Sequence, residues 1–120
     1  MEKHFELTDA EFEQQFANCQ LDPALFSHEA HLRLAWIHLE KYGLEQAKDN
    51  LHTQLLQFVS QLGAVDKYNQ SLTMAAAQVV HHFMQESETD NFRDFITQFP
   101  QLKSNFKVLI RSHAGKFGQV

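Results

Sequence analysis

Residues that interrupt or cross-link a chain are scarce in this sequence. Its 120 residues include one cysteine, two prolines and four glycines. The single cysteine, Cys19, excludes an internal disulfide framework and fits a reducing compartment. Few chain breakers and a hydrophobic content of 43% are typical of a globular chain, not a disordered one.

Long apolar runs are missing as well. No stretch approaches the ~20 residues that a membrane-spanning helix needs. The first residues, Met1–Glu6, also lack the apolar segment of a signal peptide. We therefore expect a cytoplasmic protein that does not enter a membrane.

Acidic residues are absent from the C-terminal part of the chain. The net charge of −5 argues against a general nucleic-acid binder. All fifteen acidic residues lie at or before Asp94, and four basic residues follow it: Lys103, Lys107, Arg111 and Lys116. The first three are spaced i, i+4, i+8, so on a helix they form one basic stripe. Such a stripe either keeps a helix face solvated or meets an acidic partner.

Helical periodicity runs through most of the sequence, and no stretch alternates in the period of a strand. Gly43, Gly63 and Pro100 end three of the periodic segments. At this length the chain fits one domain. We predict a single all-α domain over residues 1–120, an irregular bundle of five or six helices, with residues 112–120 as a loosely ordered tail.

The organising element is a predicted helix between Ser27, which can cap its start, and Gly43, which can end it. Its apolar side carries Leu32, Ala35, Leu39 and Tyr42. Its predicted opposite, polar side carries Glu29, Arg33 and Glu40. His28 and His31 fall within the apolar arc, where a buried imidazole needs a hydrogen bond or a metal.

Spacing limits the metal chemistry that the eight histidines suggest. His28 and His31 are separated by two residues, whereas the zinc-protease motif needs three. No Glu is followed by a His three residues later, which disfavours a di-iron bundle. An i, i+3 pair can still converge on one ion, so His28 and His31 are candidate ligands of a divalent transition metal. The alternative is that both are structural.

A second polar cluster opens the predicted fourth helix. Tyr68, Asn69 and Thr73 lie where free backbone N–H groups and the helix dipole favour an anion. The alternative is helix capping, with Asn69 as the cap and Thr73 bonded to its own backbone.

These two clusters resemble the paired signatures of an uncharacterised family of small bacterial helical proteins. That family joins aromatic-x-His-x-x-His-Leu-x-x-Ala-Trp, matched here by Phe26–Trp36, to a later Tyr-His-x-Thr-(Leu/Ile)-Thr. Tyr68–Thr73 corresponds to this second motif, with Asn69 and Ser71 in place of its His and its first Thr. The resemblance implies that the clusters form one site, built of three histidines in typical members. Asn69 replaces the third histidine, which weakens a metal site because an amide is a poor ligand for transition metals.

We therefore predict that His28, His31, Tyr68, Asn69 and Thr73 form a small polar pocket that binds a small molecule or a metal. The alternative is a non-catalytic interaction or regulatory module, in which the histidines are structural and the basic stripe meets an acidic partner. No nucleophile elbow or phosphate-binding glycine loop occurs, and the sequence identifies no reaction.

Overall fold

The computed structural model describes the backbone of residues 1–117 and the side chains of residues 1–112. Within these residues the protein is all-α, without strands, and measures 34 × 30 × 26 Å. The seven helices of the described part are α1 (Asp9–Ala17), α2 (His28–Tyr42), α3 (Leu44–Gln61), α4 (Gln70–Gln85), α5 (Phe92–Gln98), α6 (Gln101–Ser104) and α7 (Phe106–Phe117). Three 3₁₀ turns connect them, Lys3–Glu6, Pro23–Leu25 and Val65–Lys67.

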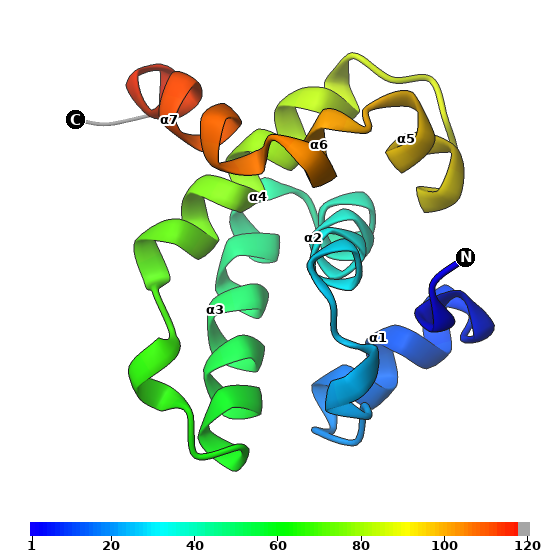
Figure 1. Cartoon of the computed structure of the whole chain (residues 1–120), viewed down its shortest axis with the longest axis vertical. Coiled ribbons are helices and arrows are strands. Elements are labelled where there is room, and N and C mark those ends of the chain that lie inside the picture. Colours follow the sequence, from blue (N-terminus) through cyan, green and yellow to red (C-terminus); the bar gives the residue numbers. More distant parts are fainter. Residues whose placement is uncertain (118–120) are drawn as a thin grey trace.

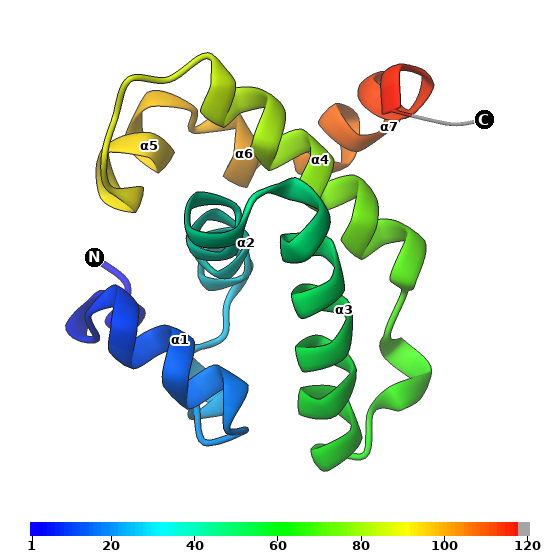
Figure 2. The same cartoon turned by 180° about the vertical axis from the view of Figure 1, so that it is seen from behind.

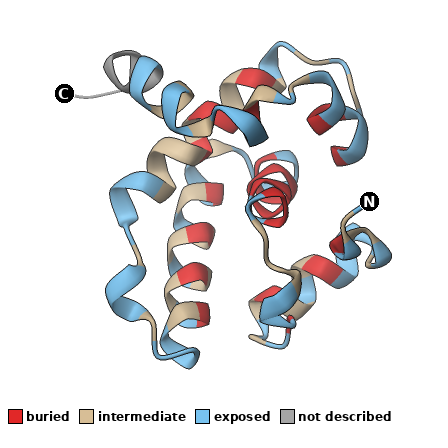
Figure 3. Cartoon of the chain, in the orientation of Figure 1, coloured by how far each residue is buried: buried red, intermediate tan, exposed pale blue. Residues whose placement is uncertain are grey.

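Helix α2 is the centre of the fold. It contacts α1, α3, α4, α5 and α6, which surround it in Figure 1 and, from behind, in Figure 2. Ten consecutive or near-consecutive residues of α2 are buried, so buried positions occur all round this helix in Figure 3. The predicted polar side of this helix, which carries Glu29, Arg33 and Glu40, is buried at two of these three residues. Glu29 and Arg33 are buried, and only Glu40 is exposed.

The segment after Pro100 was predicted as one helix but forms two, α6 and α7. The described part therefore has seven helices instead of the predicted five or six. Asn105 adopts φ −132° and ψ 32°, which breaks the chain between α6 and α7. The break lets Leu102 enter the core while Phe106 starts a new direction against His28. Helix α7 runs to Phe117, whereas the side chains of the predicted tail beyond Ser112, including Lys116, lie outside the described residues.

Local sequence signals set most helix ends. Thr8 and Glu11 form a reciprocal capping box at the start of α1, and the Ser27 hydroxyl accepts the Ala30 N–H at the start of α2. Helix α3 ends in a Schellman motif around Gly63 (φ 69°). Helix α1 ends in the same motif, but there Cys19 takes the left-handed position with φ 57°.

The core is rich in phenylalanine, with Phe12, Phe16, Phe58, Phe83, Phe92 and Phe95 all buried. Rings from different helices lie in contact, including Phe16 with Phe58 at 4.8 Å and Trp36 with Phe92 at 6.2 Å between centroids.

None of the helices in the described part combines the length and apolarity that crossing a bilayer requires.

Candidate functional site

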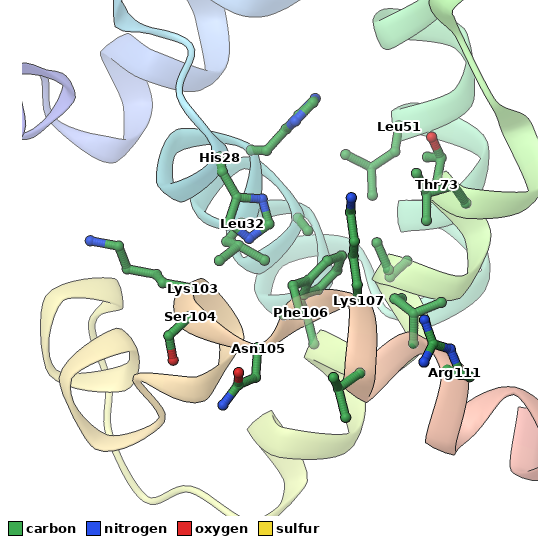
Figure 4. Close-up of a pocket in the computed structure, with 18 of the residues that line it drawn as sticks. His28, Leu32, Leu51, Thr73, Lys103, Ser104, Asn105, Phe106, Lys107 and Arg111 are labelled. Carbon is green, nitrogen blue, oxygen red and sulfur yellow. The ribbon is translucent and has the colours of Figure 1, made fainter.

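A cavity of about 700 Å³ lies between α2, α3, α4 and the α6–α7 segment (Figure 4). Its wall is mostly apolar. The apolar side chains come from four helices: Leu32, Ala35, Leu51, Leu55, Leu72, Ala76, Ala77, Val80, Phe106, Val108 and Ile110. Leu72 and Val108 are about half exposed, so the cavity is open to solvent on one side. We name it the α2–α4–α7 cavity.

Polar and cationic side chains complete the lining of this cavity. They are His28, His31, Thr73, Lys103, Ser104, Asn105, Lys107 and Arg111. The predicted basic stripe therefore lies along this cavity, because all three of its described members contribute to the lining. No acidic residue is among the side chains that line it.

The structure brings three of the five predicted site residues together. His28, His31 and Thr73 line the α2–α4–α7 cavity, whereas Tyr68 and Asn69 do not. The Asn69 side chain caps α4 by accepting the Leu72 N–H at 3.0 Å. Thr73 donates its hydroxyl hydrogen to the Asn69 carbonyl at 3.1 Å. Asn69 and Thr73 thus make the capping contacts that the alternative reading of this cluster predicted.

Tyr68 faces a different neighbour. Its hydroxyl lies 2.8 Å from Nδ1 of His52 on α3, and the two rings are 5.6 Å apart. This contact fastens the segment before α4 to α3. It leaves Tyr68 outside the cavity that His28 and His31 line.

His28 links α2 to the segment that closes the cavity. Its Nε2 lies 3.0 Å from the Leu102 carbonyl oxygen, and its ring is 4.9 Å from that of Phe106. A carbonyl oxygen only accepts, so Nε2 carries the proton and donates. The free lone pair of a neutral His28 is therefore on Nδ1.

His31 sits one turn further along, with its ring edge against Phe26 at 4.1 Å between centroids. The side chains of His28 and His31 are both exposed at the open side of the cavity, so the expectation that these imidazoles are buried was wrong. Desolvation by the protein atoms near the ring, together with the positive charge that His28 can carry, lowers the pKa of His31 to about 4. His31 is therefore neutral at pH 7 and keeps one nitrogen lone pair for a ligand.

The predicted pair of metal ligands lacks a third partner in this cavity. The lining residues include no further histidine and no cysteine or carboxylate, and three of them are cations. A divalent transition metal would have to complete its coordination from water or from a bound molecule.

A cluster of charged and polar side chains that the sequence did not predict lies beside the cavity, where the N-terminal segment packs on α2. His4 is fully buried, and Glu29 and Arg33 are 6% and 4% exposed. The His4 Nε2 lies 3.0 Å from a Glu29 carboxylate oxygen and 3.6 Å from one of Glu2. The ligand atoms of Glu2, His4 and Glu29 lie within 4.8 Å of one another, so this triad could hold a metal ion.

Two cations contact the triad, Lys103 at its carboxylates and Arg33 at its histidine. Lys103 Nζ lies 3.0 Å from Glu29 and 3.8 Å from Glu2. Arg33 Nη1 lies 3.3 Å from His4 Nδ1 and donates to the His4 carbonyl at 2.6 Å. We call Glu2, His4, Glu29, Arg33 and Lys103 the N-terminal charge network.

The hydrogen bonds of this network fix the protonation of His4. A guanidinium group only donates, so His4 Nδ1 accepts and the ring proton is on Nε2, where it is donated to Glu29. Burial alone would raise the pKa of Glu29, but the hydrogen bonds from Lys103 and His4 lower it below its ordinary value. The Glu29 carboxylate is therefore ionised at pH 7.

Lys103 belongs to both sites. It lines the α2–α4–α7 cavity and also ion-pairs with Glu29 and Glu2. In Figure 4 its side chain points away from Phe106 and Lys107, whereas Lys107 extends past Phe106 toward the space between Leu32 and Leu51. Lys103 is therefore engaged with carboxylates, whereas the Lys107 ammonium group lies over the apolar wall of the cavity.

A second buried histidine, His38, lies outside the cavity. Its Nδ1 accepts from the Asn50 side-chain amide at 3.2 Å, which leaves Nε2 buried without a hydrogen-bond partner among the described residues. Burial lowers the pKa of His38, and the charge of Glu13 opposes this effect. This polar contact between α2 and α3 could serve a site, but no cavity lining includes it.

No local signal distinguished these buried polar residues from surface ones. Glu29 and Arg33 are spaced i, i+4 on the charged side of α2, as an exposed ion pair would be. Their partners in the N-terminal segment lie 24 to 29 positions earlier in the chain. Comparisons with protein-family models, with curated proteins and with solved structures find no match to this chain.

Proposed function

We propose that the protein binds a small ligand in the α2–α4–α7 cavity. The observation that carries this proposal is a cavity of about 700 Å³ with an apolar wall, open to solvent, and with a few polar groups that converge on it. Small-molecule sites typically occupy ≈ 300–1,000 Å³ and have this mixture of apolar wall and placed polar groups.

The predicted site residues have different parts in this proposal. His28 and His31 offer imidazole nitrogens at one side of the cavity, and Thr73 lines the other. Asn69 and Tyr68 act indirectly, since Asn69 caps α4 and Tyr68 fastens the preceding segment through His52. The resemblance to a family that pairs these two motifs supports their serving one site.

Binding of an uncharged fluorescent probe tests the proposal. The naphthylamine probe N-phenyl-1-naphthylamine should fluoresce on binding to the wild type. Ala76→Trp, which fills the cavity, should abolish this signal, because Ala76 lines the cavity. Ala75→Trp is the matched control, since Ala75 is the neighbouring residue of α4 and is not part of the lining. Equal fluorescence in both variants, with both folded by circular dichroism, would refute the proposed site.

A second candidate is a divalent transition metal held by His28 and His31. The low pKa of His31 favours it, because a neutral imidazole is the form that binds metal. Elemental analysis of the purified protein should then find metal in the wild type and none in the His28→Ala, His31→Ala double variant. The absence of metal from both proteins, or its persistence in the double variant, would exclude this pair as the site.

The alternative of a non-catalytic interaction module is favoured by the bond between His28 and the Leu102 carbonyl. This bond joins α2 to α6, as a structural histidine would. In that case the His28→Ala, His31→Ala double variant loses stability, whereas Ala76→Trp still binds the acidic partner protein. The basic stripe would then be the contact surface for an acidic protein.

A further inference from the structure

The charges around the α2–α4–α7 cavity identify the class of ligand that it takes. We propose that the ligand is an anionic amphiphile, an acyl chain that ends in a carboxylate, with the chain on the apolar wall and the carboxylate beside Lys107 and Arg111. This inference rests on the proposed function and adds the chemistry of the ligand.

The first argument is the pairing of the cations. Arg33, Lys41 and Lys103 each have a carboxylate within 3.0 Å. Lys107 and Arg111 have no ion-pair partner in the part of the chain that the structure describes, and both are exposed. No acidic residue follows Asp94, so the segment carries no local counter-charge. Lys3, Lys67 and Arg93 also lack an ion pair among the described residues, but only Lys107 and Arg111 combine this with a place in the cavity lining.

The second argument is the position of these cations relative to the apolar wall. Lys107 and Arg111 are one helical turn apart on α7, and both line the cavity together with Phe106 and Ile110. Figure 4 shows Lys107 extended past Phe106 toward the space beside Leu51 and Thr73. An ion pair that forms next to an apolar wall is screened less than one in bulk water. A ligand with an anionic head and an apolar body satisfies both features.

The shape of the site favours a small amphiphile over an acidic helix of a partner protein. Helix α7, α4 and α2 bound a cavity of about 700 Å³, whereas a docked helix needs a long groove. Thr73 and the imidazole of His31 also line the cavity and add polar groups that an acyl carboxylate or its bound water can contact.

Three ligands with the same chain and different heads provide the test. Dodecanoate, dodecanol and dodecyltrimethylammonium compete with N-phenyl-1-naphthylamine for the wild type, each below its micelle concentration. Dodecanoate should compete about tenfold more strongly than dodecanol, and the cation least, as two partly exposed charge pairs would give. The preference should fall as salt is added.

Charge-neutral variants assign the preference to the two residues. Lys107→Met with Arg111→Met should remove the advantage of dodecanoate, so that the ratio of its competition to that of dodecanol falls about tenfold, to one. Lys67→Met is the control, because Lys67 is exposed and lies outside the lining.

The outcomes separate the two proposals. Equal competition by all three ligands would overturn the inference about charge while the cavity remains a binding site. A probe that binds the Ala76→Trp variant as well as the wild type would overturn the proposed function and this inference with it. Displacement of the probe by an acidic amphipathic peptide, but not by dodecanoate, would identify a protein partner and overturn the assignment of an acyl ligand.

Discussion

Arg33 Nη1 lies 3.3 Å from Nδ1 of His4, although 29 positions separate the two residues in sequence. The same guanidinium donates to the backbone carbonyls of His4 and Leu7 and to the Asp9 carboxylate. One side chain of α2 therefore holds the N-terminal segment in place and sets the tautomer of the imidazole that donates to Glu29.

Replacement of Arg33 by methionine should destabilise the fold by roughly 3–5 kcal/mol, because it leaves the His4 ring, the His4 and Leu7 carbonyls and the Asp9 carboxylate without their partner. Urea unfolding at pH 7 measures this loss. Lys48→Met is the control, since its partner Glu45 is 87% exposed and the pair lies 3.7 Å apart. A loss for Arg33→Met no larger than that for Lys48→Met would contradict the role of the network.

Removal of the Lys103 ammonium should create a cation site. In the wild type this group neutralises Glu29 and Glu2, and a divalent ion at Glu2, His4 and Glu29 would have to displace it. We expect Lys103→Met to bind Mn²⁺ in a calorimetric titration at least tenfold more tightly than the wild type, since carboxylate oxygens suit this ion. Lys107→Met should behave as the wild type. Tight Mn²⁺ binding by the wild type itself would show that Lys103 does not block the triad.

Acid should destabilise the protein partly through His31. The pKa of this residue is about 4 in the fold, against 6.5 for the unconstrained side chain, so the unfolded chain binds the proton more tightly between these values. Stability that is present above pH 6.5 is therefore lost as the pH falls toward 4.

The urea midpoints of the wild type and of His31→Gln measure this contribution between pH 7 and 4. The wild type should lose more stability than the variant over this range. His81→Gln, which removes an imidazole of α4 outside the cavity, should follow the wild type. Parallel curves for the wild type and His31→Gln would show that His31 has its ordinary pKa in the fold.

The left-handed backbone of Cys19 should be a source of strain. Its φ of 57° is unfavourable for a side chain with Cβ, and Gly63 occupies the equivalent position at the end of α3. Cys19→Gly should raise the free energy of unfolding by about 0.5–1 kcal/mol. Asn18→Gly, at φ −91°, should lower it, because no strain is relieved there. Destabilisation by Cys19→Gly would show that the thiol packs more favourably than the strain costs.

The sequence was sufficient for the parts of the fold that local physics decides. The capping box of Thr8, the cap at Ser27 and the stops at Gly43 and Gly63 depend on a few neighbouring residues, and the structure has helix boundaries at all of them. The single break that was missed, at Asn105, lies in a segment whose apolar period continues across it. Nothing local separates a bent pair of helices from one straight helix there.

Long-range packing decided what the sequence left open. Glu29 and Arg33 occupy positions on α2 that a helical wheel assigns to solvent. They are buried because residues 2–9 pack against this side of α2 and Lys103 of α6 reaches Glu29. The same limit applies to the candidate site. His28, His31 and Thr73 meet in one cavity, while Asn69, one turn before Thr73, points its amide at its own helix.

The enclosure of α2 by five neighbours has a consequence for how the molecule comes apart. Each of these five helices loses packing when α2 is lost, so opening that leaves α2 in place is expected at the periphery. Amide hydrogens near Leu34 and Ile37 should exchange only through complete unfolding, and their exchange rates would report the global stability of the protein.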